Sequence, residues 1–331
     1  MSKQSKSGWL VTIVDQVIVS LGNFVFVISL SKALSPSHFG LYSLVWMLVV
    51  AAGAFVNAWY SSPLTTISPT LGNLDADKFL ATLVTEFFAL MLILYFLTLL
   101  TSWILIENYS ALYIDVLLLV AAGISFYIYD FFRKIAILKR KSYSLLIIDT
   151  VTFLSLITVC WGLRNAQFVR INAAIFGIFS ISAVAMIFTL HHHLSIRNKF
   201  WLKRLLHKGV YSRRAEYSKW ISFSSIFQII SGAGVVMLSS TLLPLNQIGF
   251  LRIAQSLTSI FNPVYVYLDN HIKMEFSAIL KTFGQTEMLE RYSIFGMIFM
   301  ISLLTLCISL AVVSGRVVEF IYPESENSEV I

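Results

Sequence analysis

The sequence predicts an all-α integral membrane protein with about nine transmembrane helices. Hydrophobic residues make up 57% of the chain and charged residues only 12%, whereas a soluble domain carries roughly 25% charged residues. The mean hydropathy is +0.80. Apolar runs recur that reach the ~20 residues a helix needs to cross a bilayer. The ~10-residue alternating segments typical of a membrane β-barrel are absent.

The predicted spans follow one another along most of the chain. Tryptophans near their ends fit the aromatic belts of membrane interfaces; they are Trp9, Trp59, Trp103, Trp161 and Trp220. The first apolar run lacks a small-residue cleavage site, so we expect an uncleaved helix. The predicted spans cover approximately 9–33, 40–62, 79–105, 111–132, 143–163, 171–190, 219–243, 249–271 and 292–314.

Basic residues predict the orientation of the spans. Most of the 24 lysines and arginines fall in the N-terminal tail and in the loops after every second span. The loop after the fourth span is assigned Arg133, Lys134, Lys139, Arg140 and Lys141. By the positive-inside rule, these loops and the N-terminus are cytoplasmic. The net charge of +7 therefore reflects membrane topology, and we expect no nucleic-acid partner.

The longest predicted connection divides the chain into a larger and a smaller part. A six-helix N-terminal lobe is expected over 1–190, and an incomplete C-terminal lobe of three helices and an acidic tail over 219–331. Between them, 191–218 forms a basic cytoplasmic linker. Its stretch RNKFWLKRLLHK predicts an amphipathic helix on the membrane surface. A lipid-regulatory role for that helix is the alternative to a plain linker.

The two lobes open with similar sequences. Each begins with Trp and continues with Gln, Ser and Gly, a Pro-containing hairpin and a further Gly. The matched pairs are Trp9 with Trp220, Gln16 with Gln228, Ser20 with Ser231, Gly22 with Gly232 and Gly40 with Gly249. Because six spans precede the second copy, the copies are expected to run parallel, with a substrate site between them.

A polar stripe interrupts the first span. Gln16, Ser20 and Asn23 are four and three residues apart and share one helix face, with Asp15 beside it. A charge in mid-membrane costs ~2.5–3.5 kcal/mol, so the stripe should face the bundle interior. Two interpretations stay open. The stripe lines a hydrated cavity or a coupling-ion site, or it is a polar clamp between helices worth ~0.6 kcal/mol per hydrogen bond.

Other polar residues inside spans complete the set of candidate cavity or coupling residues. Glu86 and Asp149 lie deep in the third and fifth spans, and Gln228 and Gln255 lie in the seventh and eighth. Arg252 stands a few residues into the eighth span. It either snorkels to the outer surface or offers a fork of donors to a phosphate or an acidic sugar.

No catalytic or metal motif is present. His191, His192 and His193 are consecutive, and consecutive helical residues point roughly 100° apart, so one helix cannot converge them on one ion. The chain has two cysteines, and it lacks a Gly-rich phosphate loop and a nucleophile elbow. The sequence therefore predicts a protein that is not an enzyme and that uses neither metal nor cofactor.

The opening of the first lobe resembles that of O-antigen and polysaccharide flippases of the Wzx type, in the multidrug/oligosaccharidyl-lipid/polysaccharide exporter superfamily. The stretch is DQVIVSLGNFVFVISLSKALSPSHFGLYSLVWM. It carries Asp-Gln, then Gly-Asn-Phe, a Ser-Pro-containing hairpin and Phe-Gly-Leu-Tyr. The opening of the second lobe resembles the corresponding region through IGFLRIAQSLTSIFNPVYVYLDN.

Such relatives have two pseudo-symmetric, MATE-like lobes of six helices. They move an undecaprenyl-pyrophosphate-linked oligosaccharide from the cytoplasmic to the outer leaflet of the bacterial inner membrane. The resemblance implies the same multi-pass location and activity here, with lipid-linked oligosaccharide and membrane lipids as partners. Glycan polymerase and chain-length proteins are candidate further partners. The polar stripe would line the inner wall of the first lobe and contact sugar hydroxyls or a coupling ion.

Two alternatives remain beside transport. A twelve-helix plan needs three more spans, so we expect either that the coding region continues or that the chain is a truncated, non-transporting remnant. The enzyme alternative is a polytopic polysaccharide polymerase or ligase. Such enzymes usually carry a large extracytoplasmic loop, whereas the longest predicted loop here is cytoplasmic and basic.

Overall fold

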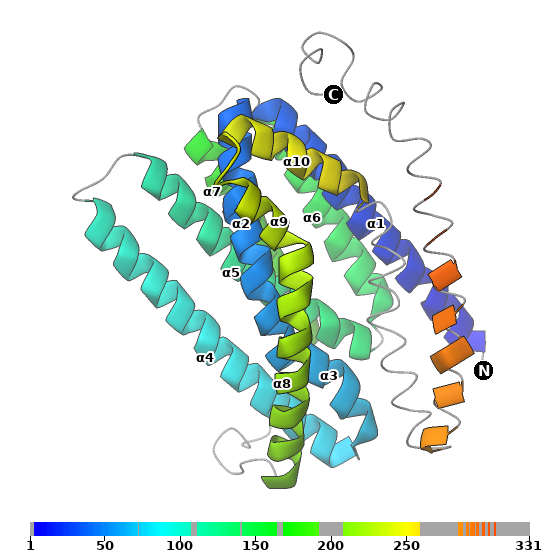
Figure 1. The fold of residues 1–331 in the computed structure, drawn as a ribbon. Helices are drawn as coiled ribbons and strands as arrows, with labels where there is room; N and C mark the ends of the chain where they lie inside the picture. Colours follow the sequence, from blue (N-terminus) through cyan, green and yellow to red (C-terminus); the bar gives the residue numbers. More distant parts are fainter. Residues whose placement is uncertain are drawn as a thin grey trace. The chain divides into compact units, whose positions relative to one another are not determined.

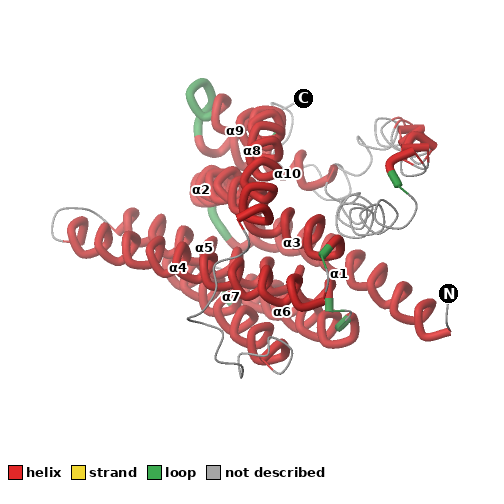
Figure 2. Tube along the Cα trace, turned by 90° about the horizontal axis from the view of Figure 1, so that it is seen from below, coloured by secondary structure: helices red, strands yellow, loops and turns green. Residues whose placement is uncertain are grey.

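The computed structural model of the chain is helical wherever long segments are described (Figure 2). Among the described residues no strand occurs. The chain forms two compact units, Met1–Met274 and Glu275–Ile331. The residues described are 3–71, 73–106, 111–139, 141–163, 168–191 and 208–258, with scattered positions between 284 and 308.

Within the described residues, six helical segments are long and apolar enough to cross a membrane. A bent pair, Tyr211–Ser231 with Ala233–Ser239, brings the number to as many as seven. These segments match the first seven predicted spans, so the prediction of an all-α membrane protein is confirmed. The eighth span is described only as far as Thr258, and the ninth only at scattered positions. The count of nine and the two-lobe architecture therefore stay predictions.

The helices of the first unit are named in chain order (Figure 1). They are α1 Lys3–Ala33, α2 Pro36–Val56, η1 Asn57–Ser61, α3 Ser62–Ile67, η2 Ser68–Thr70, α4 Asn73–Ile106, α5 Ala111–Leu138, α6 Ser142–Gly162, α7 Phe168–His191, α8 Lys208–Ser231, α9 Ala233–Ser239 and α10 Leu245–Thr258.

The second span is continuous but irregular. Ser35 caps α2, its hydroxyl accepting from the backbone N–H of His38 at 3.4 Å, and Pro36 occupies the first turn, where its missing N–H costs nothing. Further along, α2 passes into the π-helix η1, a widened turn that is rare and frequently found at functional sites. Pro63 then stands in the first turn of α3, and the span continues to Thr70.

The seventh span differs from its predicted bounds. Its helix α8 begins at Lys208, so residues 208–218 of the predicted linker are helical. The predicted amphipathic helix, except for its last residue Lys208, falls on residues outside the described part, together with His192 and His193. After α8, the path bends by 44° at Gly232 before α9 begins.

Aromatic and small residues pack the helices of the first unit together. α1 packs mainly on α6, α5 on α7, and α2 on both α5 and α10. The rings of Tyr42 and Trp46 stack with centroids 5.8 Å apart, and Trp46 stacks on Phe179 at 6.0 Å, which joins α2 to α7. Gly22 lies against Phe153, where a Cβ would come within 2.6 Å of the ring. A small residue therefore permits the close approach of α1 and α6.

Long-range contacts place the loops at two ends of the bundle. Lys139 Nζ lies 3.2 Å from Asp77 Oδ1, so the connections after the second and fourth spans meet at one end. His38 stacks on Phe168 at 4.9 Å, so the connections after the first and fifth spans meet at the opposite end. This alternation agrees with consecutive membrane crossings. Which end is cytoplasmic stays a prediction.

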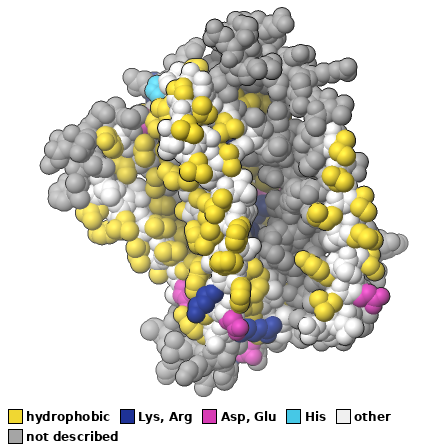
Figure 3. Space-filling model, in the orientation of Figure 1, with side chains coloured by type: hydrophobic (Ala, Val, Ile, Leu, Met, Phe, Trp, Pro, Cys, Tyr) yellow, Lys and Arg dark blue, Asp and Glu magenta, His cyan; other side chains and the backbone are white. Residues whose placement is uncertain are grey.

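The face drawn in Figure 3 is largely apolar, with charged side chains gathered toward its lower end. On α8, exposed Arg213, Glu216 and Lys219 precede exposed Phe223 and Phe227 along the helix. This division is the one expected where a membrane helix leaves the headgroup region and enters the acyl chains.

Candidate functional site

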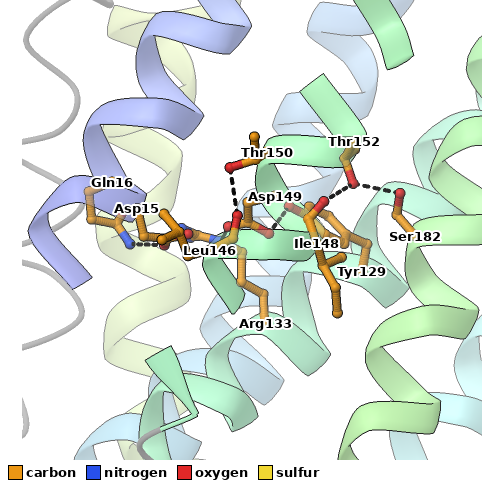
Figure 4. A network of polar contacts seen from close by, with 10 residues as sticks. All are labelled: Asp15, Gln16, Tyr129, Arg133, Leu146, Ile148, Asp149, Thr150, Thr152 and Ser182. Atoms are coloured by element: carbon orange, nitrogen blue, oxygen red, sulfur yellow. Dashed lines mark hydrogen bonds and ion pairs between the residues drawn. The ribbon is translucent and has the colours of Figure 1, made fainter. Parts of the chain in front are cut away.

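A buried arginine on α5 organises the most polar part of the bundle. Tyr129 and Arg133 are four residues apart and therefore lie on the same face of α5. That face meets α1, which carries Asp15, and α6, which carries Asp149. Figure 4 shows these side chains converging from the three helices. We call Asp15, Tyr129, Arg133 and Asp149 the arginine cluster.

Arg133 lies between the two carboxylates. Its Nη2 donates to Asp15 Oδ2 at 2.7 Å, and its Nε donates to Asp149 Oδ2 at 2.6 Å. The hydroxyl of Tyr129 donates to Asp149 Oδ1, and Gln16 Nε2 donates to Asp15 Oδ2 at 3.2 Å. Charge-assisted hydrogen bonds of this length are the strong class, so the cluster ties three helices together.

The arginine cluster is closed off from its surroundings. The side chain of Arg133 is 4% exposed, and those of Asp15 and Asp149 are 0% exposed. Within the described part of the chain, Asp15 Oδ1 and Gln16 Oε1 are buried acceptors without a hydrogen-bond partner. Asp15 thus faces protein in this structure, as a polar stripe in a membrane helix should.

The charge of the arginine cluster is unbalanced. With both carboxylates ionised, two negative charges face one positive charge, and like charges in one buried site oppose their simultaneous ionisation. One proton on the free oxygen of Asp15 would make the cluster neutral. The arrangement can therefore take up and release a proton at that oxygen.

A second buried arginine joins α8 to the helices around η1. Arg214 Nη1 donates to Glu86 on α4, and its Nη2 donates to the carbonyl of Trp59 at 3.2 Å. Its guanidinium carbon lies 5.5 Å from the ring centroid of Tyr60, within cation–π range. The Arg214 side chain is 4% exposed and that of Glu86 is 37% exposed. One turn further along α8, Tyr217 bonds Thr66 at 2.9 Å.

A lysine joins α5 to the same π-helix. Lys134 Nζ donates to Asn57 Oδ1 at 2.7 Å and pairs with Asp130 Oδ2 at 3.2 Å. The basic residue next to Arg133 therefore points to η1, whereas Arg133 points to α1 and α6. Both partners in η1, the Asn57 side chain and the Trp59 carbonyl, come from the five residues whose backbone is π-helical.

The remaining predicted candidates lie apart from the arginine cluster. Asn23 is half-buried on α1, and Gln228 is exposed on α8. Gln255 on α10 donates to the carbonyl of Gly232 at 3.5 Å. Arg252 lies near enough to Tyr42 for an electrostatic interaction. Its Nε is buried without a hydrogen-bond partner among the described residues.

Sequence reasoning misplaced three buried basic side chains. It assigned Arg133 and Lys134 to a cytoplasmic loop, but α5 continues to Leu138 and both residues are buried in it. The signal that favours this position is the apolar run IAIL that follows them, which prolongs the helix. Arg214 was assigned to the linker, yet it is buried in α8. Among the described residues, no three His, Cys, Asp or Glu side chains lie where they could hold a metal ion together.

Comparison with known proteins adds no further identification. No family model, curated protein or solved structure matches the chain.

Proposed function

We propose that this chain is a flippase that moves an undecaprenyl-pyrophosphate-linked oligosaccharide, such as an O-antigen repeat unit, across the bacterial inner membrane by alternating access. The support is the likeness of its opening stretch to Wzx-type flippases, together with the buried ionisable residues of its spans. Its partners are the lipid-linked oligosaccharide and the surrounding lipids. The proposal assigns no catalytic step to the chain.

The observation that carries the proposal is the arginine cluster. Ionisable residues are costly inside a membrane and typically mark ion or substrate pathways. One carboxylate would neutralise Arg133. The second carboxylate adds a negative charge that an ion pair does not require. In the proposed cycle, a proton binds at Asp15 Oδ1 and neutralises the cluster. Its release restores a buried net negative charge, which favours a state in which water reaches the cluster.

Arg252 is the proposed contact for the anionic part of the cargo. A guanidinium presents several donors in a planar fork that matches phosphate geometry. The Nε of Arg252 has no hydrogen-bond partner among the described residues. In the proposed cycle, a pyrophosphate or an acidic sugar supplies an acceptor for this donor.

A structural role for the arginine cluster is the competing candidate. Both carboxylates bond Arg133, which is also what a clamp between helices requires. A chain whose cluster is only a clamp could be a non-transporting remnant. The two candidates differ in what happens when the charge of Asp15 is removed while its shape is kept.

The test is complementation of a flippase-null strain by residues 1–331 carrying Asp15→Asn. Surface glycan display and membrane abundance are both measured. We expect display to fall while abundance stays at the wild-type level. Asp75→Asn is the matched control, because Asp75 is exposed and pairs with Lys78 on the same helix. Parallel loss of display and abundance would identify a clamp, and a wild-type chain that restores no display would overturn the flippase proposal.

A further inference from the structure

The two carboxylates of the arginine cluster differ in how their oxygens are bonded (Figure 4). Asp149 has a donor on each oxygen, since the Tyr129 hydroxyl donates to Oδ1 and Arg133 Nε donates to Oδ2 at 2.6 Å. Asp15 has both donors on Oδ2, from Arg133 Nη2 at 2.7 Å and from Gln16 Nε2 at 3.2 Å. Its Oδ1 is buried and has no hydrogen-bond partner in the described part of the chain. The two carboxylates therefore differ in what a proton would displace.

A proton on Asp149 would displace a bond that is already made. Tyr129 is 2% exposed, and the one hydrogen of its hydroxyl is given to Asp149 Oδ1. A proton on that oxygen would compete with the phenol hydrogen for the same contact, and one of the two would lose its acceptor. A proton on Oδ2 would meet the Nε–H of Arg133. Both oxygens of Asp149 are thus occupied by donors, an arrangement that suits the ionised carboxylate.

A proton on Asp15 Oδ1 displaces no bond and supplies a donor that is missing. The Oε1 of Gln16 is a second buried acceptor without a partner among the described residues. A carboxylic acid and an amide that share one N–H···O bond can close a second bond, in which the acid O–H donates to the amide oxygen. The terminal torsions of both side chains are broad enough for this alignment. One proton therefore satisfies two acceptors that the ionised cluster leaves unsatisfied.

The charged groups that act on Asp15 belong to the cluster itself. They are Arg133 on α5 and Asp149 on α6. Two further helices, α2 and α10, also contact α1. The titratable residues that they carry are His38, Tyr42 and Arg252. Within the described residues, none of these three acts electrostatically on Asp15, so the place of the proton is decided among the cluster and Gln16.

We propose that Tyr129 and Gln16 are positioning residues that confine the exchangeable proton of the arginine cluster to Asp15. A proton from water forms an O–H bond at Asp15 Oδ1, which changes the cluster from one net negative charge to neutral. The new O–H donates to Gln16 Oε1. Release returns the proton to water, and Asp149 stays ionised throughout. This inference rests on the proton-binding step of the proposed function and is independent of the cargo.

Infrared difference spectroscopy of the purified full chain in lipid nanodiscs detects the proton directly. A protonated carboxyl group has a carbonyl stretching band that shifts in heavy water. Subtracting the acid-induced spectrum of Asp15→Asn from that of the wild type isolates the band of the arginine cluster, because the variant has one carboxylate for one arginine and needs no proton. We expect a single such band, which we call the cluster band.

The first variant removes the amide that receives the proton. Gln16→Leu should move the cluster band to a higher wavenumber, because the Asp15 carbonyl oxygen loses a donor and the acid O–H loses its acceptor. Gln247→Leu is the control, since Gln247 is exposed in the first turn of α10. It should leave the cluster band where it is in the wild type. An unmoved band in Gln16→Leu would overturn the inference.

The second variant frees the competing carboxylate. Tyr129→Phe leaves Asp149 Oδ1 without its donor, so the proton should divide between the two carboxyl groups and the cluster band should split in two. Tyr127→Phe is the matched control, because its hydroxyl also lies on α5 and donates to the backbone carbonyl of Val49. A merely structural role of Tyr129 predicts a single band in both variants. The change removes one oxygen atom, so it decides the question even if Gln16→Leu does not fold.

A proton held by Asp149 predicts the reverse pattern. Gln16→Leu would then leave the cluster band unmoved, and Tyr129→Phe would shift the whole band. That pattern, or the lack of a cluster band at any pH, would overturn the inference. Failure of the proposed function is separate. A chain that complements a flippase-null strain while its band ignores Gln16→Leu loses only this inference, and one with the expected bands that restores no surface glycan loses only the flippase.

Discussion

Arg133 Nη2 lies 2.7 Å from Asp15 Oδ2, although the two residues are 118 positions apart in the chain. The contact joins the fourth predicted span to the first. Both side chains are buried. Removing one of them leaves an uncompensated buried charge, which lowers the stability of the protein more than replacing all the charged groups by neutral ones. That asymmetry separates a buried charge cluster from a surface ion pair.

We therefore expect Arg133→Met to destabilise the protein strongly. It leaves two buried carboxylates without a cation, at a cost of about 3–5 kcal/mol. The combined variant Arg133→Met, Asp15→Asn, Asp149→Asn should recover most of that loss. Thermal unfolding in detergent measures both. Lys139→Met is the control and should cost at most about 1 kcal/mol, because the Asp77 side chain that pairs with Lys139 is 69% exposed. Equal losses in the single and the combined variant would contradict the prediction.

Tyr129→Phe should weaken the arginine cluster without dismantling it. The change removes the hydroxyl that donates to Asp149 Oδ1 and leaves a buried acceptor with one bond fewer, at about 1–3 kcal/mol. Tyr143→Phe is the matched control, since Tyr143 is 63% exposed. Melting temperatures of the two variants give the comparison, and a Tyr129→Phe protein as stable as Tyr143→Phe would argue against the bond.

Arg214 and Glu86 should be energetically coupled. A double-mutant cycle of Arg214→Met and Glu86→Gln is expected to give an interaction energy of about 1–3 kcal/mol. The same cycle on Lys78 and Asp75, which form an exposed pair, should give less than about 1 kcal/mol. The readout is the free energy of unfolding in detergent. An interaction energy no larger than that of the exposed pair would show that the contact of Arg214 with Glu86 does not hold α8 against α4.

Arg252→Lys should impair glycan export nearly as much as Arg252→Gln. Lysine keeps the charge but lacks the planar fork that binds a phosphate through two bonds. Lys219→Gln serves as the control, because Lys219 is an exposed cation on α8. Surface glycan display and accumulation of the lipid-linked precursor report the effect. Normal export from both Arg252 variants would leave only the snorkelling interpretation of this residue.

Single cysteines in three connections should report the topology. Ser37→Cys is expected on the extracytoplasmic side, and Lys78→Cys and Ser142→Cys on the cytoplasmic side, following the positive-inside rule. The contact of Asp77 with Lys139 already places the last two connections at one end. Labelling of intact cells with an impermeant maleimide decides the sides, and label on Lys78→Cys but not on Ser37→Cys would invert the orientation.

The elements could be read from the sequence more easily than their contacts. Apolar runs of bilayer length predicted the first seven spans, and the helical spacing of Gln16, Ser20 and Asn23, with Asp15 beside them, predicted a stripe that faces the bundle interior. The structure buries Asp15, Gln16 and Ser20 and leaves Asn23 half-buried. Both results follow from local periodicity and from the cost of exposing charge to lipid, which a single sequence contains.

The hydrogen-bond partners of the two buried arginines could not be predicted from the sequence in the same way. Arg133 bonds residues 118 and 16 positions away, and Arg214 bonds one 128 positions away. No local sequence pattern indicates a contact between residues so far apart in the chain. Charge counting also worked against both arginines, because each stands beside a basic run that was predicted to be cytoplasmic and was grouped with it. The length of the apolar run was the better predictor of burial. When apolar residues continue beyond a charged residue, the helix continues as well, and the charged residue then lies inside the bundle.

The π-helix η1 has a consequence for residue register. A π-helical turn amounts to one residue inserted into an α-helix, and each residue turns the helix by roughly 100°. Deleting one residue between Asn57 and Ser61 would therefore restore regular geometry and rotate everything from Pro63 to Thr70 about the helix axis. Thr66 would turn away from Tyr217, and the Asn57 and Trp59 acceptors would no longer sit together for Lys134 and Arg214. The one extra residue in this largely buried segment thus keeps its contacts with both α5 and α8 on the correct faces of the second span.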